Sequence, residues 1–139
     1  GPDARKFFDS MLAASEGESP PTVRARISAE INDRLTEDSA AEAEDVLDRY
    51  LAYRERVREV EDDPPSDPWD RLRLLREIRL AELGDDIADT MFSDVDLQDE
   101  YAAQHDRIVR DPALTAEQRE KALAELDGKY PPEARTPSR

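Results

Sequence analysis

The sequence predicts an all-α protein in which a three-helix mini-domain is followed by an extended helical region. Helix-start signals recur along the chain, with a serine, threonine or aspartate placed before a proline or three residues before a glutamate or glutamine. Between these signals the apolar residues recur at intervals of three and four, the period of one helix face. No stretch alternates apolar and polar residues over more than a few positions, so no strand is expected.

The first predicted helix lies between Asp3, which stands at an N-cap position, and Gly17, which stands at a C′ position. Its apolar residues fall at positions 4, 7, 8, 11 and 12, the i, i+3, i+4 and i+7 spacing of one helix face. Arg5 and Asp9 are four residues apart, so we expect them to be neighbours on the surface of this helix.

Two further helices complete the predicted mini-domain. Ser19 is placed to cap the second helix, and its apolar stripe consists of Val23, Ile27, Ile31 and Leu35. The segment from Ser39 to Glu42 has the pattern of a capping box at the start of the third helix. The apolar seam of that helix consists of Ala43, Val46, Tyr50, Tyr53, Val57 and Val60. Tyr50 and Tyr53 are candidate partner-binding aromatics, but we expect core residues whose hydroxyls reach solvent.

A boundary is predicted at residues 61–68, where an acidic run is followed by two prolines that cannot continue a helix. We therefore expect a mini-domain over residues 3–61, an extended helical module over 67–130 and a flexible tail over 131–139. In the second module Asp67 should cap a helix that ends before Gly84, and Asp85 should start a short helix. A further helix is expected over residues 94–109. Thr115 opens a second capping box, for a last helix that ends at Gly128.

The composition limits the kind of partner that the chain can have. Charged residues make up 40% of the chain and its formal net charge is −15. A nucleic-acid-binding protein needs a basic surface, so this balance argues against nucleic acid and equally against an anionic membrane surface. The chain has no cysteine and no apolar run of about 18 residues, so neither a disulfide nor a membrane-spanning helix is expected. Gly1-Pro2 resembles the remnant of a protease-cleavage site, so the natural N-terminus is expected to lie elsewhere.

The sequence has no pattern typical of an enzyme. It contains no Gly-x-Ser-x-Gly elbow, no P-loop and no glycine-rich dinucleotide turn. His105 lies on the inner face of its predicted helix, where we expect a core or boundary residue and neither a metal ligand nor a general base. Residues 94–105 superficially resemble an EF-hand loop, but Asp99 replaces the glycine and His105 the final glutamate. We therefore expect no metal, no cofactor and no catalytic residue.

The segment from Arg5 to Ala14 resembles the Arg-x-x-Phe-Asp-Tyr-(Phe/Cys)-Leu-Ser-Ala motif of the bacterial lipase chaperones, also called lipase-specific foldases. The matching residues are Arg5, Phe8, Asp9, Leu12 and Ala14, whereas Ser10, Met11 and Ala13 differ from the motif. Residues 47–54, 83–94, 108–119 and 130–133 resemble later segments of the same family, in the same order. The resemblance covers the family's first small domain and the start of its extended helical region. The chain is therefore either a piece of a longer protein or a naturally short relative.

The resemblance implies a steric foldase that binds a secreted lipase or a related α/β-hydrolase and assists its folding without consuming a nucleotide. It also implies a place in lipid degradation, a periplasmic location and an inner-membrane anchor outside this chain. The implied partner-binding residues are those of the foldase motif: Arg5, Phe8, Asp9, Ser10, Met11 and Leu12. The effect of Ser10 in place of the motif tyrosine stays open. The alternative is an acidic helical interaction or adaptor module without foldase activity, in which Arg5 and Asp9 form an ordinary surface ion pair.

Overall fold

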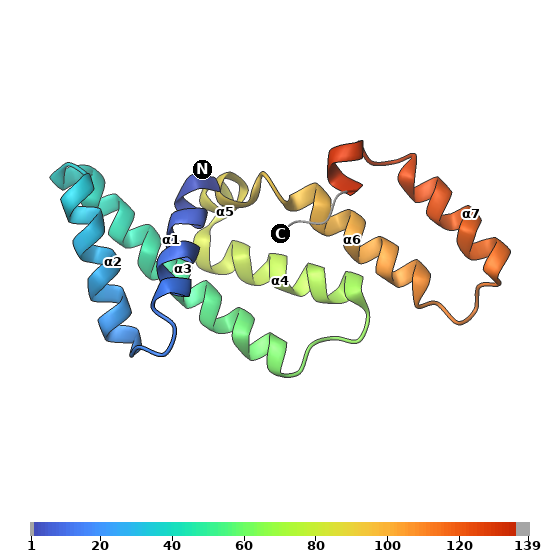
Figure 1. Ribbon diagram of the computed structural model, residues 1–139, viewed down its shortest axis with the longest axis horizontal. Helices are drawn as coiled ribbons and strands as arrows, with labels where there is room; N and C mark the ends of the chain where they lie inside the picture. The colour runs from blue at the N-terminus through green and yellow to red at the C-terminus, as the bar shows by residue number, and fades with distance from the viewer. Residues whose placement is uncertain (1, 136–139) are drawn as a thin grey trace. The chain divides into compact units, whose positions relative to one another are not determined.

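The structure is a computed structural model that describes residues 2–135 (Figure 1). Over these residues it contains seven α-helices, one 3-10 helix and no strand, so the predicted all-α class is confirmed. The elements are α1 (Pro2–Ala14), α2 (Pro20–Arg34), α3 (Glu37–Asp62), α4 (Pro68–Leu83), α5 (Asp85–Phe92), α6 (Asp96–Val109), α7 (Ala116–Asp127) and η1 (Pro132–Arg135). None of these helices is long and apolar enough to cross a bilayer.

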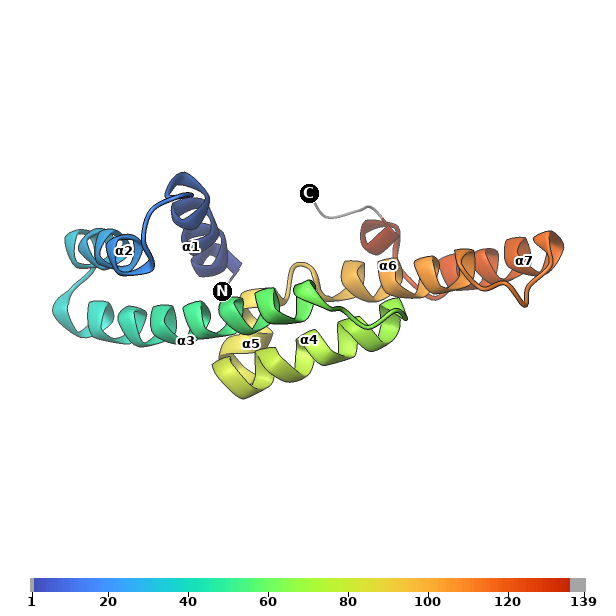
Figure 2. The same ribbon diagram turned by 90° about the horizontal axis from the view of Figure 1, so that it is seen from below.

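The first of two compact units comprises the chain up to Arg56 together with Arg79–Phe92. It contains α1, α2, most of α3, the end of α4 and α5. Figures 1 and 2 show α2 alongside the first half of α3, and α1 contacts both α2 and α5. The core consists of apolar side chains that are at most 8% exposed: Phe8, Val23, Ile27, Ile31, Ala40, Leu47, Tyr50, Tyr53, Leu83, Ala88, Met91 and Phe92.

The second unit comprises Val57–Ile78 and the chain from Ser93 onward. Within it α6 contacts both α7 and η1 (Figure 1). Arg76 on α4 donates to Oε1 of Glu100 on α6 over 2.8 Å, and the Tyr101 hydroxyl on α6 donates to Oδ1 of Asp127 on α7 over 2.6 Å. Each unit thus draws on α3 and α4, whereas the sequence suggested consecutive modules over residues 3–61 and 67–130. Those boundaries stay predictions about which parts fold independently.

Most predicted helix ends match the structure because they depend on neighbouring residues alone. The Ser19 side chain accepts a hydrogen bond from the Thr22 amide, and Oδ1 of Asp67 accepts one from the Trp69 amide over 3.0 Å. Thr115 forms both bonds of the predicted capping box. Gly84 ends α4 with φ +78°, a left-handed conformation that a side chain would disfavour.

The predicted capping box at Ser39 is wrong. The helix α3 already begins at Glu37, and Oγ1 of Thr36 accepts from the Ser39 amide over 3.4 Å. Thr36 therefore occupies the capping position, three residues earlier than predicted. The seam of α3 is also shifted, because Leu47 is fully buried whereas Val46 is only half-buried.

Part of the predicted tail over 131–139 forms a short helix in the structure. Residues 132–135 form η1, in which Ala134 is 3% exposed. The Gln98 side chain on α6 donates to the Glu133 carbonyl over 3.2 Å. The apolar contact of Ala134 and this hydrogen bond hold η1 on α6. The last four positions of the predicted tail, 136–139, lie outside the described residues.

Candidate functional site

The motif helix α1 is anchored by Phe8, which is 3% exposed. Its ring contacts the ring of Tyr50 on α3, with 5.7 Å between the ring centroids. The row of rings continues from Tyr50 to Tyr53 at 5.8 Å and from Tyr53 to Phe92 on α5 at 5.6 Å. Such tilted and edge-on pairs stabilise by about 0.5–1.5 kcal/mol each beyond their buried area. The predicted core role of Tyr50 and Tyr53 is confirmed, but the Tyr50 hydroxyl, which was expected to reach solvent, donates to Asp9.

Asp9 lies one position beyond Phe8 and contacts α3 through a single carboxylate oxygen. The Tyr50 hydroxyl donates to Oδ1 of Asp9 over 2.5 Å, and Nη1 of Arg54 donates to the same oxygen over 3.0 Å. Burial raises the pKa of the Tyr50 hydroxyl well above its usual value, and the bond to Asp9 raises that pKa further. The Tyr50 hydroxyl therefore stays protonated and donates its hydrogen bond to Asp9 throughout the physiological pH range.

Arg5 and Asp9, expected as neighbours on the helix surface, use different partners in the structure. The Arg5 guanidinium lies over the Phe92 ring at 5.3 Å, and the guanidinium of Arg79 lies 3.7 Å from the same ring centroid. Arg79 is only 7% exposed, so its charge is placed inside the unit against an aromatic ring. We call the residues Arg5, Phe8, Asp9, Tyr50, Tyr53, Arg54, Arg79 and Phe92 the α1 cluster.

The remaining motif residues differ in how far they reach solvent. Met11 and Leu12 are half-buried, and Ser10 is exposed. Ser10 shares its exposed face with Lys6, Ala13 and Ala14, which are three or four residues away along the helix. The structure therefore brings Arg5, Phe8 and Asp9 into one cluster and leaves the position of the motif tyrosine on the outer side of α1.

The connection from α1 to α2 is fixed by Arg26 on α2. Nη1 of Arg26 donates to Oγ of the buried Ser15 over 2.7 Å, and Nη2 donates to Oε1 of Glu18 over 2.7 Å. The hydrogen bond from Arg26 lowers the pKa of Glu18. Gly17, between these two partners, has φ +88°, so the loop needs a glycine there. These contacts set the position at which α1 ends.

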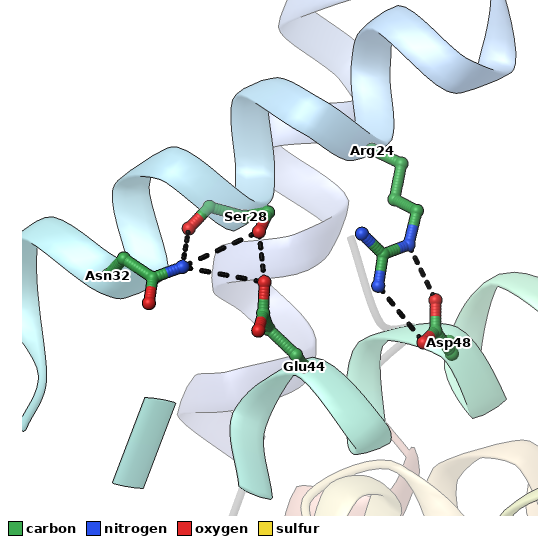
Figure 3. Close-up of polar contacts among 5 residues, drawn as sticks. All are labelled: Arg24, Ser28, Asn32, Glu44 and Asp48. Atoms are coloured by element: carbon green, nitrogen blue, oxygen red, sulfur yellow. Dashed lines mark hydrogen bonds and ion pairs between the residues drawn. The ribbon is translucent and has the colours of Figure 1, made fainter. Parts of the chain in front are cut away.

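A polar seam joins α2 and α3 (Figure 3). Ser28 donates to Oε1 of Glu44, and Nδ2 of Asn32 donates both to the Ser28 carbonyl over 2.8 Å and to Oε1 of Glu44 over 3.4 Å. Farther along, Arg24 pairs with Asp48. Each of these five side chains bonds to a side chain of the other helix, so the seam favours one register of α2 on α3. Among residues 2–135 no three metal-ligating side chains lie together.

The sequence alone does not mark Arg54, Arg79 or Phe92 as parts of the site. Phe92 falls in the short helix predicted to start at Asp85, and nothing in the sequence distinguishes the two arginines from the other charged residues. The contacts that Arg54 and Phe92 make with α1 join positions that are 45 and 87 residues apart along the chain, and Arg79 joins the site through its contact with Phe92. No local pattern encodes such pairs, because helical periodicity shows which face is apolar but not what covers it.

Comparison with known proteins gives one family. The profile of the family described as "Proteobacterial lipase chaperone protein" matches residues 46–139. The lipase chaperone of Chromobacterium violaceum is 25% identical over 92% of this chain, and that of Ectopseudomonas mendocina is 28% identical over 96%. The lipase chaperone of Xylella fastidiosa strain M23 is 31% identical over 91% of this chain.

The matched part is a fraction of each relative. The alignments cover 42%, 41% and 38% of those three proteins, so the chain spans about two fifths of their length. No solved structure gives a significant match to this chain. The family profile begins within α3, downstream of α1. The roles of the α1 residues therefore depend on the motif and on the contacts described above.

Proposed function

Because this chain belongs to the proteobacterial lipase chaperone family, we propose that it is part of a steric foldase. In this proposal it binds a secreted lipase or a related α/β-hydrolase and assists its folding to the active state. The observation that carries the proposal is the family match over residues 46–139. A foldase of this kind accelerates folding by binding the folding transition state more tightly than the unfolded client. Each reduction of the activation free energy by about 1.4 kcal/mol raises the folding rate tenfold.

The α1 cluster supports a role for the motif helix in contacting the client. Phe8 is buried and acts as the anchor of α1, so the client contacts fall to Arg5, Asp9 and Ser10, with Met11 and Leu12 at the edge. Polar groups that are already held in place lose little freedom when a partner binds, which favours binding. The net charge of −15 adds long-range attraction for a client with a basic surface.

The named relatives are lipase chaperones, and we propose that this chain has no catalytic activity of its own. We also propose a periplasmic location, where a secreted lipase passes, and an inner-membrane anchor outside this chain. The adaptor alternative is less favoured, since the family match supplies a specific role for a helical interaction protein.

Refolding of a denatured client tests the proposal. A urea-denatured secreted lipase from the organism that supplies this chain is diluted into buffer with the chain or with an equal amount of an unrelated acidic protein. We expect ester hydrolysis to recover only with the chain, and native gel filtration to show a complex. Binding without recovered activity would favour the adaptor alternative, and absence of both binding and recovery would overturn the proposal.

A further inference from the structure

Resting on the proposed function, we propose that Asp9 divides its two carboxylate oxygens between two tasks. Oδ1 docks α1 on α3, and Oδ2 accepts a hydrogen bond from the client lipase. Tyr50 is the positioning residue that holds the carboxylate in this orientation, although it does not itself touch the client.

The two intramolecular bonds of Asp9 converge on one oxygen. The Tyr50 hydroxyl and Nη1 of Arg54 both donate to Oδ1, over 2.5 and 3.0 Å. The two donors are one turn apart on α3, so they approach Asp9 from the same helix face. Among residues 2–135 no hydrogen bond to Oδ2 is present. The Asp9 side chain is 41% exposed, so this second oxygen keeps its acceptor capacity in water.

Tyr50 and Arg54 do not contribute equally to the orientation of Asp9. Tyr50 is 2% exposed and packs between the rings of Phe8 and Tyr53, so its hydroxyl has one fixed position. The Arg54 side chain is 49% exposed, so it has greater freedom to move. The Tyr50 hydroxyl therefore sets the orientation of the Asp9 carboxylate, and the Arg54 side chain adjusts to that orientation.

A carboxylate held in this way is prepared for a partner. A hydrogen bond to an ionised acceptor is stronger than a neutral one, and an acceptor that is fixed before binding loses less conformational freedom. The matching group on the client is a hydrogen-bond donor, such as a backbone amide. Without the Tyr50 hydroxyl the carboxylate would rotate and present either oxygen, and the client would have to order it on binding.

The second unit offers a matched control. The Tyr101 hydroxyl donates to Oδ1 of Asp127 over 2.6 Å, between α6 and α7, and the bond to Asp127 raises the pKa of Tyr101. Tyr50→Phe and Tyr101→Phe each remove one hydroxyl that donates to an aspartate, and only the first change touches the motif helix. A loss caused simply by a missing tyrosine–aspartate bond should appear in both variants.

Asp9→Asn separates the roles of the two oxygens. Two donors face the Oδ1 position, so they select the amide oxygen for that place and leave the amide nitrogen at the Oδ2 position. The variant therefore keeps the two hydrogen bonds that join α1 to α3, but it presents an N–H donor to the client in place of the Oδ2 acceptor. Its folding should be nearly unchanged while its binding to the client should be lost.

The test measures binding of the urea-denatured lipase and its recovered ester hydrolysis for four variants, together with their thermal melts. We expect Asp9→Asn to weaken binding about tenfold or more and Tyr50→Phe about fivefold, with wild-type behaviour for Tyr101→Phe. In the Asp9→Asn background, Tyr50→Phe should cause no further loss of binding.

The outcomes distinguish this inference from the proposed function. Equal effects of Tyr50→Phe and Tyr101→Phe on binding, or an additive loss in the double variant, would overturn the inference. The proposed foldase function would still stand if the wild-type chain binds and reactivates the lipase. Full binding by Asp9→Asn would overturn the assignment of Oδ2. A wild-type chain that neither binds nor reactivates the lipase would overturn both.

Discussion

Arg24 on α2 and Asp48 on α3 form a two-point ion pair in which two guanidinium nitrogens face two carboxylate oxygens. Nε of Arg24 donates to Oδ1 of Asp48 over 2.7 Å, and Nη2 donates to Oδ2 over 3.0 Å (Figure 3). The hydrogen bonds from Arg24 lower the pKa of Asp48. The side chains are 40% and 56% exposed, so water screens the attraction. The pair therefore guides α2 onto α3 but should stabilise the fold only slightly.

The first prediction concerns the pH and salt dependence of this pair. In a double-mutant cycle of Arg24→Gln and Asp48→Asn followed by urea unfolding, we expect a coupling free energy of about 0.5–1 kcal/mol at pH 7. The folded-state pKa of Asp48 is depressed, so this stability is present above the unfolded value of 3.8 and is lost as the pH falls through the folded-state value. A coupling that persists at pH 2, or that ignores about 1 M salt, would contradict an ionic origin.

The second prediction compares a cap that the structure confirms with one that it does not. Oγ1 of Thr115 accepts from the Gln118 amide over 3.1 Å, and Oε1 of Gln118 accepts from the Thr115 amide over 2.9 Å. Thr115→Ala should therefore lower the free energy of unfolding by about 1 kcal/mol. Ser39→Ala should change it by only a few tenths, because Thr36 caps α3 and Ser39 lies inside the first turn. Chemical denaturation measures both, and a larger loss for Ser39→Ala would restore the discarded capping box.

These two positions show what could be predicted from the sequence. The caps at Ser19, Asp67 and Thr115 follow from residues within three positions of each other, so the local pattern was sufficient. The box at Ser39 was misplaced because Thr36, three residues earlier, is an equally good cap, and only packing decides between them. In α3 the register shifted because Val46 and Leu47 are adjacent and both apolar, so spacing alone could not choose which of them faces the core.

The sequence predicted which residues of α1 and α3 belong to the candidate site, but not how they pair. The motif resemblance identified Arg5, Phe8 and Asp9, and the seam of α3 contained Tyr50 and Tyr53. The bond from Tyr50 to Asp9 spans 41 positions, and Phe92 reaches the cluster from a short helix that lies in the predicted second module. Such pairings depend on how helices pack, and a single sequence carries no local signal for them.

The third prediction concerns the connection between α3 and α4. Residues 61–64 and 66 are exposed, and two of the connecting residues are prolines, which donate no backbone hydrogen bond. Amide exchange should be fast for residue 66 and, because the last turn of a helix frays, also for residues 61–63 at the end of α3. Residues 46–57, around the buried Leu47, Tyr50 and Tyr53, should be protected. Native-state hydrogen exchange measures this. Equal and strong protection in both stretches would contradict the predicted joint between the modules 3–61 and 67–130.

The fourth prediction concerns the position of the motif tyrosine. Ser10 is exposed on α1, so Ser10→Tyr adds a side chain that needs no room in the core. If the exposed face of α1 contacts the client, the added ring should raise the recovered lipase activity while the melting temperature stays within a few degrees. Lys6→Tyr, one turn away on the same exposed face, is the matched control and should not raise it. An equal gain from both variants would indicate general stickiness and not a specific contact.

The last prediction separates the packing role of Arg5 from its proposed role toward the client. Arg5 lies over the Phe92 ring at 5.3 Å, and Arg34 on α2 lies over the Phe7 ring at 5.2 Å, so the chain contains two similar cation–π contacts with α1 on one side of each. Each contact is worth about 0.5–1 kcal/mol at a partly exposed site, so Arg5→Ala and Arg34→Ala should shift the thermal melt by comparable amounts.

The two variants should differ in function. We expect Arg5→Ala to reduce recovered lipase activity by about tenfold or more, since the variant would lose the proposed client contact in addition to the packing contact, whereas Arg34→Ala should reduce it little. Arg5→Lys keeps the charge but not the flat guanidinium, so this variant should retain only part of the wild-type recovery of lipase activity. Equal losses of activity in Arg5→Ala and Arg34→Ala, in proportion to their melts, would mean that Arg5 acts through the stability of the first unit. The motif match would then describe a packing contact, and the client would have to be bound elsewhere on the chain.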